Sequence, residues 1–305
     1  MIFDGDHSVI AALREKKRLR ETSQPHEHIR PLLIQGGGLM RGVYGVGAVL
    51  ALEERGFTNA FSTMVGISSG APIVAHFAAG TAKEGVQILL EDCTDPKFVN
   101  PWRFWNQVDT NHFMDVVRND PRKKIDVAKV FANPAEVFFG VAEYKTALPK
   151  LIKPHNEEHF FKSMHASINM QNVSSYKVII DGVQYADGGF SSPHVIGKAI
   201  EEVKPTHVLV VTNNDRDFTP IFRKERLLNR TIFRLRLNGV LAQAINSRRE
   251  ARDTAIADAI EGGIPTAVVW GDGSISGMEK NPAKIAATVE ASRVWWHGFL
   301  SADEN

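Results

Sequence analysis

The sequence predicts an α/β fold in which a mostly parallel central sheet lies between helices. Short apolar segments alternate with longer segments of helical periodicity, which is typical of strands followed by covering helices. Glycine-rich turns at 36–42 and 66–70 join two of the apolar segments directly to helices. The chain has 305 residues, 43% of them hydrophobic, which suffices for one large core. The expected strands are 31–35, 63–66, 176–180, 206–212 and 266–270.

Composition excludes several classes of function. A formal net charge of +1 gives no electrostatic reason to expect a nucleic-acid partner. The single cysteine, Cys93, cannot form an internal disulfide. No signal peptide, lipid-attachment pattern or run of about 18 apolar residues is visible, so the sequence predicts a cytoplasmic protein.

The first 30 residues predict a basic N-terminal arm that precedes a single domain at 31–305. A cluster of basic side chains is followed by a polar stretch from Glu21 to His28. Such a cluster is typical of a solvated helix face, and it also suits transient contact with anionic lipid headgroups. His26 and His28 form a His-x-His pair that could bind a metal ion, although such pairs more often have no function. The basic residues are Arg14, Lys16, Lys17, Arg18 and Arg20.

The first strand of the domain, Pro31–Gln35, leads into a glycine-rich loop and a helix that runs to about Arg55. Glycines allow the backbone to approach a ligand closely, and unpaired amides at a helix start attract negative charge. The loop could therefore hold a phosphate or a developing oxyanion. Its sequence is Gly36-Gly37-Gly38-Leu39-Met40-Arg41-Gly42.

Ser68 is the centre of a GxSxG pattern at the end of the next strand. In a nucleophile elbow the serine adopts a strained backbone conformation, and small residues two positions before and after it relieve crowding. Gly66 and Gly70 occupy those positions. A helix is expected over 69–79, with Gly80 as its C-terminal cap.

Asp187 is the candidate partner of the serine. It ends the apolar segment Val183–Asp187 and precedes the turn glycines Gly188 and Gly189. A carboxylate in this position can orient or deprotonate a serine hydroxyl.

The segment 101–170 is less regular, and we expect it to be an embellishment beside the site. It contains a possible strand pair at 136–144 and 146–152 and a helix at 157–164. Helices are also expected at 240–261 and 282–299, where Trp295 and Trp296 would dock the last one. The aromatic residues of the irregular segment are Trp102, Phe104, Trp105, Phe138, Phe139, Phe160 and Phe161.

The three ordered motifs resemble the patatin-like phospholipase family, of the bacterial type, over about residues 31–215. The resemblance implies a three-layer α/β/α fold and a Ser-Asp dyad, with Ser68 as nucleophile and Asp187 as base. It places the oxyanion hole at the amides around Gly37 and Gly38, within the loop Gly36–Gly42, with Arg41 supporting that loop. Leu39 stands where the family often has a third glycine, which leaves the second amide donor open.

The function implied by this resemblance is hydrolysis of carboxylic esters of lipids through an acyl-enzyme intermediate. The expected partner is a lipid or acyl-ester substrate, with no metal or other cofactor and with transient contact at a membrane surface. The apolar residues of 101–170 would wall a pocket for the acyl chain.

Three alternatives remain open at this stage. One is an α/β-hydrolase type of Ser-His-Asp triad, for which His194 is the candidate histidine. Another is dinucleotide binding, although Gly36, Gly38 and Gly42 miss the GxGxxG spacing by one residue. The third is an acyl-lipid binder that keeps the fold without catalysis.

Overall fold

The computed structural model describes residues 1–305 except 101, 104–105, 172, 217–238, 247 and 303–305. The described strands form one nine-stranded sheet in the order β1-β9-β8-β2-β3-β4-β7-β6, with β5 paired to β4. The pairs among β9, β8, β2, β3 and β4 are parallel, whereas β1, β5, β6 and β7 pair antiparallel at the margins. The strands are β1 (Ile2–Gly5), β2 (Pro31–Gln35), β3 (Thr63–Ile67), β4 (Glu136–Glu143), β5 (Pro149–Ile152), β6 (Val178–Ile180), β7 (Val183–Asp187), β8 (His207–Val211) and β9 (Thr266–Trp270).

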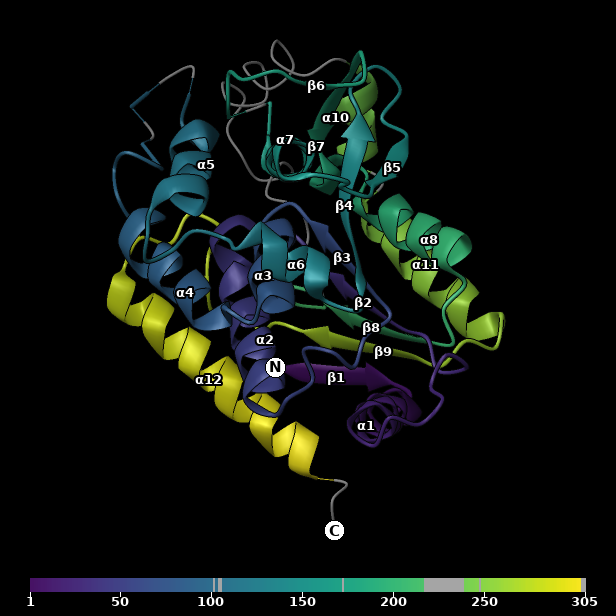
Figure 1. The fold of residues 1–305 in the computed structure, drawn as a ribbon. Helices are drawn as coiled ribbons and strands as arrows, with labels where there is room; N and C mark the ends of the chain where they lie inside the picture. The colour runs from purple at the N-terminus through teal and green to yellow at the C-terminus, as the bar shows by residue number, and fades with distance from the viewer. Residues whose placement is uncertain (101, 104–105, 172, 217–238, 247, 303–305) are drawn as a thin grey trace.

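Helices cover both faces of this sheet and make three layers, as the sequence predicts. Figure 1 shows α2, α3 and α12 on one face and α8 and α11 on the other. The helices are α1 (Ser8–Glu21), α2 (Val43–Glu54), α3 (Gly70–Ala79), α4 (Ala82–Gln87), α5 (Thr110–Asn119), α6 (Val127–Ala132), α7 (Glu157–Ile168), α8 (Ser192–Val203), α10 (Gly239–Asn246), α11 (Arg248–Glu261) and α12 (Pro282–Ser301). Short helical turns are η1 (Leu39–Gly42), η2 (Ile88–Asp92) and η3 (Gly188–Phe190).

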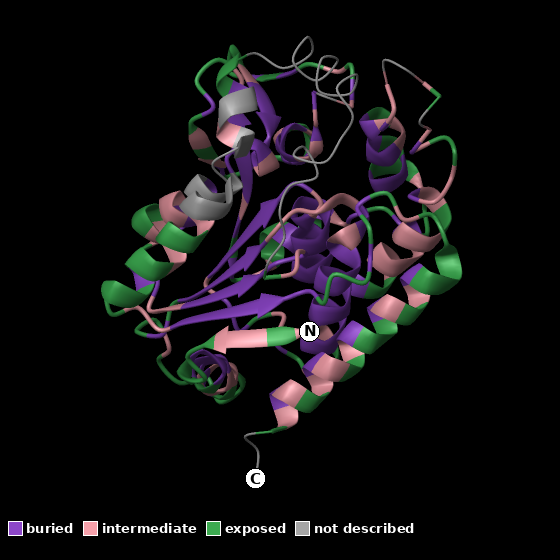
Figure 2. Ribbon diagram, turned by 180° about the vertical axis from the view of Figure 1, so that it is seen from behind, coloured by how far each residue is buried: buried purple, intermediate pink, exposed green. Residues whose placement is uncertain are grey.

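Successive side chains of the central strands point to opposite faces of the sheet, and this divides the core into two parts. Leu32 and Ile34 of β2 pack with α8, whereas Leu33 packs with α2, α3 and α12. Both faces of β2 and β3 are buried, as Figure 2 shows, because helices cover each of them. The apolar runs that identified these strands in the sequence are therefore a consequence of burial on both sides.

Residues 1–30 are not a separate arm, and this expectation is corrected. The strand β1 joins the sheet edge beside β9, and α1 buries Val9, Ile10 and Leu13 in the core. Lys16 of the basic cluster is only 4% exposed and donates to Ile29 O at 2.7 Å and to Ser62 Oγ. Burial lowers the pKa of its ammonium to about 8.

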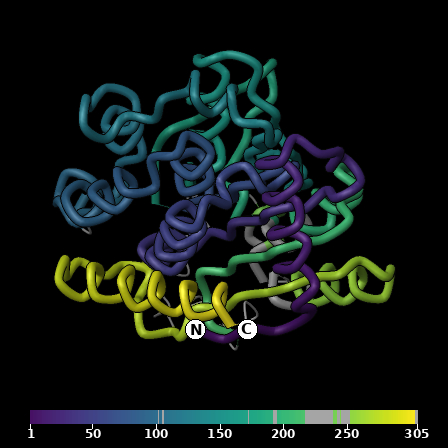
Figure 3. Tube along the Cα trace, turned by 60° about the horizontal axis from the view of Figure 1, so that its bottom comes forward, coloured from purple at the N-terminus to yellow at the C-terminus, as the bar shows by residue number. Residues whose placement is uncertain are grey.

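The N-terminus lies beside the last helix, α12, as Figure 3 shows. The rings of Phe3 and Phe299 are 4.7 Å apart, and the Ser292 hydroxyl donates to the Met1 sulfur at 3.1 Å. These contacts attach β1 to α12, so the N-terminal segment is packed from two directions.

The other elements that the sequence predicts are present, with differences at their ends. The pair β4–β5 is antiparallel, α7 extends four residues beyond the expected 157–164, and Gly80 caps α3 with φ 68°. The helix expected at 240–261 is described as α10 and α11, with residue 247 outside the description. Trp296 is fully buried and docks α12, while Trp295 stacks on Phe299. Of the expected aromatics of the irregular segment, Phe104 and Trp105 lie outside the described residues.

Candidate active site

Ser68 lies on the turn between β3 and α3, in a conformation that few non-glycine residues adopt. Its φ is 55°, and its side chain is buried, with the residue 6% exposed. A Cβ at Gly66 would lie 2.5 Å from Ala71 Cα, and one at Gly70 would lie 2.1 Å from Gln35 O. The turn therefore requires glycine at both positions, because any side chain there would crowd the strand and the helix, as the GxSxG pattern predicts.

The Ser68 hydroxyl donates to Asp187 Oδ2 at 2.8 Å. The other carboxylate oxygen, Oδ1, accepts from the Gly189 amide at 2.6 Å, so the turn after β7 orients the acid. Asp187 is 2% exposed. The two side chains that the sequence proposed as a pair are thus in direct contact.

The strand register explains why residues so distant in sequence meet. Ile67, the last residue of β3, pairs with Gly140 of β4, and Asp187, the last residue of β7, pairs with Val141. The strand β5 occupies the opposite edge of β4 at Val141. The strands β3 and β7 therefore share one edge of β4 and meet end to end, with Ser68 at the junction.

Ser167 on α7 supports the nucleophile turn and was missed in the sequence. Its hydroxyl accepts from the Ser68 amide at 3.0 Å and donates to Gly140 O at 2.7 Å. A Cβ at Gly188 would lie 2.1 Å from the same Gly140 oxygen, so backbone segments approach closely here. The only local signal was a pair of serines, Ser163 and Ser167, four residues apart on a helix; both are fully buried.

The glycine loop lies directly against the nucleophile. A Cβ at Gly37 would lie 2.5 Å from Ser68 Cβ and 3.1 Å from Ser68 Oγ. The Gly36 amide donates to Val211 O at 2.9 Å, which removes Gly36 as an oxyanion donor. The amides of Gly37, Gly38 and Leu39 donate to no acceptor in the described part of the chain. Three neighbouring amides are therefore available beside the serine hydroxyl.

Leu39 stands where patatin-like proteins often have a third glycine, and its backbone conformation accounts for that preference. Its φ is 53°, the left-handed conformation for which glycine is the ordinary residue. The chain thus keeps the backbone of a glycine at this position with a leucine side chain. That side chain lines the pocket described below.

Arg41 packs against the glycine loop and against the segment that contains Gly277. Its amide donates to Gly38 O at 3.1 Å, and the Met40 amide donates to Gly277 O at 3.3 Å. A Cβ at Gly277 would lie 3.1 Å from the Arg41 guanidinium, so the two segments are closely packed. Burial lowers the pKa of Arg41, and the nearby Asp215 carboxylate partly offsets this effect.

Asn213 is a second positioning residue that the sequence did not indicate. Its Nδ2 donates to Gly36 O at 2.6 Å, and its Oδ1 accepts from the Gly45 amide at 3.0 Å. Gln35 Nε2 donates to the same Oδ1 at 3.3 Å. Asn213 therefore joins the loop to the start of α2. Gly42, at the end of η1, packs against Ser69 and Ile73.

An apolar pocket of about 870 Å³, counted out to its open mouth, extends from Ser68. Its walls come mainly from α2, α3, α4, η2 and the following residues Cys93, Phe98 and Val99. The segment 101–170 was expected to supply the wall, but its described residues contribute only Val108, Thr110, Phe113 and Ile168. Phe139, Phe160 and Phe161 pack in the core instead, where their rings contact one another edge to face.

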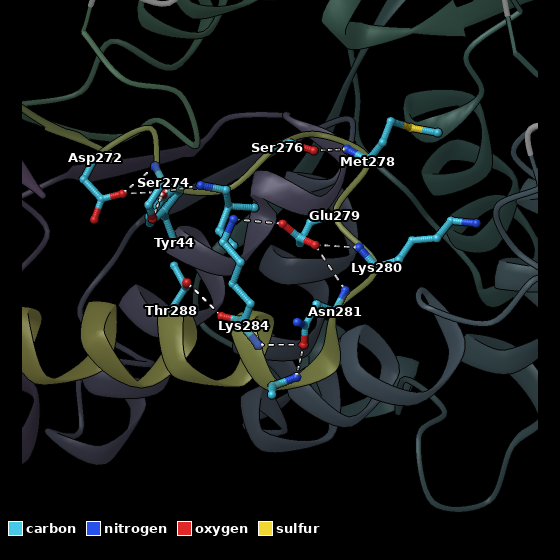
Figure 4. A network of polar contacts seen from close by, with 12 residues as sticks. Tyr44, Asp272, Ser274, Ser276, Met278, Glu279, Lys280, Asn281, Lys284 and Thr288 are labelled. Carbon is cyan, nitrogen blue, oxygen red and sulfur yellow. Dashed lines mark hydrogen bonds and ion pairs between the residues drawn. The ribbon is translucent and has the colours of Figure 1, made fainter.

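The segment 271–281 contributes to the pocket wall. Figure 4 shows the polar contacts that fix it to α2 and α12. The Tyr44 hydroxyl donates to Asp272 Oδ1 at 2.5 Å and accepts from the Ile275 amide at 3.3 Å. Lys280 Nζ donates to the backbone oxygen of Val99, a residue of the pocket wall, at 2.8 Å. These contacts bring Gly277 and Met278 to the pocket wall.

The alternatives have less geometric support. His194 lies in α8, but its side chain is outside the described part of the structure. Gly36–Gly42 lies against Ser68, and a dinucleotide-binding function does not explain this contact.

Within the described residues no group of three or more His, Cys, Asp or Glu could hold a metal ion. His26, one of the two residues of the His-x-His pair, contacts Arg20. None of the described helices is long and apolar enough to cross a membrane.

Comparison with known proteins identifies the family of this chain. The family model for patatin-like phospholipase matches residues 32–200, and the chain belongs to that family. Among solved structures, VipD from Legionella pneumophila has a similar fold, with a TM-score of 0.52 and 11% sequence identity. The match covers 90% of this chain and 67% of VipD. A comparison with curated proteins gave no match. Family membership supports a function of the lipid acyl hydrolase type.

Proposed function

We propose that this protein is a serine acyl hydrolase that cleaves carboxylic ester bonds of lipids through the Ser68–Asp187 dyad. The observation that carries the proposal is the 2.8 Å hydrogen bond from Ser68 Oγ to Asp187 Oδ2 at the end of an apolar pocket. A serine hydroxyl is a poor nucleophile at neutral pH and requires a base within hydrogen-bond distance.

In the first half-reaction Ser68 Oγ attacks the ester carbonyl carbon while its proton passes to Asp187. The tetrahedral intermediate then expels the alcohol, which takes the proton from Asp187, and leaves an acyl-serine. Water repeats the sequence: Asp187 accepts a proton from water as the hydroxide adds to the acyl carbon. The tetrahedral intermediate then expels Ser68 Oγ, which takes the proton back from Asp187, and the carboxylic acid departs. Atoms and protons balance without a further reactant.

The amides of Gly37, Gly38 and Leu39 are the proposed oxyanion donors. They adjoin Ser68 and have no acceptor in the described residues. Removal of one such donor typically costs about 2.7 to 4 kcal/mol of transition-state stabilisation. Arg41 acts through the loop, as a positioning residue.

The pocket supports acyl chains as the part of the substrate that is recognised. Its walls are almost wholly apolar, and each buried methylene contributes up to about 0.8 kcal/mol. We therefore expect kcat/KM for p-nitrophenyl esters to rise as the acyl chain lengthens from two to about eight carbons. A flat or falling trend with monomeric substrates would favour a small-ester hydrolase.

Transient contact with a membrane surface from the cytoplasm is part of the proposal. Val99 and Val108 line the pocket and pair as a β-bridge. Trp102 lies between them in the sequence, and its side chain is 94% exposed. An exposed indole beside a lipid pocket suits the membrane–water interface, where amphipathic aromatic side chains are favoured.

The test compares carboxylate variants in ester hydrolysis. Asp187→Asn should lower kcat by at least 100-fold, because the amide cannot accept the Ser68 proton as a carboxylate does. The matched control is Asp181→Asn, at the exposed turn between β6 and β7, which should keep full activity. His194→Ala should have a much smaller effect than Asp187→Asn. Equal losses in those two variants would support the triad instead, and a folded wild type without turnover would support the silent acyl-lipid binder.

A further inference from the structure

An imidazole lies in the mostly apolar pocket wall, two turns along α3 from the nucleophile turn. His76 lies on α3 and lines the pocket together with Pro72 and Ile73 from the preceding turns. It is 2% exposed. Around it the pocket is lined by apolar residues such as Ile88 and Cys93.

The hydrogen bonding of His76 is incomplete. Its Nδ1 lies 3.0 Å from Thr81 Oγ1, whereas its Nε2 is buried and has no partner among the described residues. A Cβ at Gly85 would lie 3.5 Å from the ring, so α4 packs over the imidazole without offering a polar group. A buried polar atom without a partner is costly, and native structures ordinarily satisfy such atoms. The position of His76 in a pocket wall suggests that a ligand supplies the partner.

The ring is neutral at ordinary pH. Burial lowers the pKa of His76 to about 4. The Thr81 hydroxyl can either donate to Nδ1 or accept from it, so Nε2 is a donor in one tautomer and an acceptor in the other. A hydroxyl group is able to pair with both forms, because it donates and accepts.

The distance along α3 from the nucleophile turn to His76 determines which carbon of the acyl chain would carry that hydroxyl. Seven residues separate Ser69 from His76, which at about 1.5 Å per residue corresponds to roughly 10 Å. Carbon–carbon bonds of about 1.5 Å in a zigzag advance roughly 1.25 Å each, so an extended chain of about eight carbons spans that distance.

We propose that the pocket selects acyl chains that carry a hydroxyl group at about the eighth carbon, with the carbonyl carbon counted as the first, and that His76 Nε2 binds this hydroxyl. The proposal rests on the proposed function, since it assigns the acyl chain to this pocket. His76 is then a specificity-determining residue and takes no part in bond cleavage.

The test compares p-nitrophenyl octanoate with the esters of 4-, 6- and 8-hydroxyoctanoic acid. For the wild type, the ratio of kcat/KM between the hydroxylated and plain esters should be highest for the 8-hydroxy ester. His76→Leu should lower this ratio about 5- to 10-fold, chiefly by improving use of the plain ester, as expected for one neutral hydrogen bond. His76→Gln keeps a polar group and should retain part of the preference.

Two further readouts separate this inference from the proposed function. Thermal unfolding and fluorophosphonate labelling of each variant establish that the fold and the nucleophile are intact. Calorimetry of free octanoate and 8-hydroxyoctanoate with Ser68→Ala measures pocket selectivity without catalysis. Tighter binding of the hydroxy acid that His76→Leu abolishes would support the inference even if no ester is cleaved. Equal ratios in wild type and His76→Leu, with ester hydrolysis intact, would overturn it and leave the proposed function standing.

Discussion

Ser68 combines a strained backbone with a buried, hydrogen-bonded side chain. A non-glycine residue with φ near 55° costs roughly 1 to 2 kcal/mol and persists only where the surroundings enforce it. Here Ser167 enforces it by accepting the Ser68 amide and donating to Gly140 O. The strain aims the hydroxyl at Asp187, so positioning and chemistry depend on the same turn.

Ser167→Ala should therefore weaken both stability and turnover. It leaves the buried Ser68 amide without its acceptor and removes one donor from Gly140 O, which costs about 1 to 3 kcal/mol in unfolding free energy. We expect kcat to fall about 10-fold as the turn relaxes, with KM nearly unchanged. Urea unfolding and ester kinetics measure the two effects.

Ser163→Ala is the matched control, one helical turn earlier on α7. Its Oγ is buried and has no hydrogen-bond partner within the described residues, so its removal should cost little or nothing. If both variants behave alike, loss of a buried hydroxyl explains the effect and the role of Ser167 at the turn is wrong.

The elements of the site meet because three strand ends converge. The loop Gly36–Gly42 follows β2, Ser68 follows β3, and Asp187 ends β7, which abuts β3 along β4. The carboxyl ends of adjacent parallel strands meet at one edge of a sheet, which is where ligands bind in open α/β folds. Close packing between Gly37 and Ser68 completes the arrangement.

Gly37→Ala tests whether this loop serves the transition state. The added methyl would lie 2.5 Å from Ser68 Cβ, so either the amide or the nucleophile must shift. We expect kcat to fall at least 100-fold with little change in KM, since the donor acts mainly on the oxyanion. Gly298→Ala on α12, where nothing lies within 4 Å of the added methyl, is the control and should leave kcat unchanged.

A rise in KM at constant kcat would instead indicate that the loop binds the ground state. Micromolar affinity for NAD or ATP in calorimetry would likewise contradict an oxyanion function and restore the nucleotide-binding alternative.

Local patterns predicted the parts of the site, and long-range packing decided the rest. The strands β2 and β3, both glycine turns and the paired residues Ser68 and Asp187 follow from motifs within a few residues. Ser167 and Asn213 could not be found in this way, because each acts on backbone groups far away in sequence. The pocket wall was assigned to the wrong segment for the same reason: apolar residues of α2, α3 and η2 are indistinguishable from core residues until the tertiary structure is known.

At the level of the whole molecule, the N-terminal segment shows how composition misleads. Basic residues between 14 and 20 suggested a solvated arm, yet neighbouring apolar residues of the same helix, such as Leu13 and Leu19, are buried. Lys16 is buried with its ammonium donating to a backbone carbonyl, a use of lysine that charge counting cannot reveal.

Two buried histidines reduce the stability of the fold in acid. Burial lowers the pKa of His76 and of His165 from 6.5 to about 4, opposed by Thr81 in the first case and by Asp109 in the second. Between pH 6.5 and 4 the unfolded state binds more protons, so the free energy of unfolding falls as pH falls through this range. For His76 the loss approaches about 3 kcal/mol at pH 4.

Urea unfolding at pH 7, 5.5 and 4 measures this dependence. His165→Asn should flatten the decline relative to wild type, whereas His28→Asn, which changes an exposed histidine, should not. Parallel pH curves for wild type and His165→Asn would contradict the assignment.

Fluorophosphonate labelling followed by peptide mapping tests the Ser68–Asp187 dyad most directly. A single modified residue, Ser68, is expected in the wild type, with no label in Ser68→Ala and strongly slowed labelling in Asp187→Asn. Ser8→Ala, at the exposed start of α1, should label like the wild type. Label that persists in Ser68→Ala, or that maps to another residue, would contradict the assignment of the nucleophile.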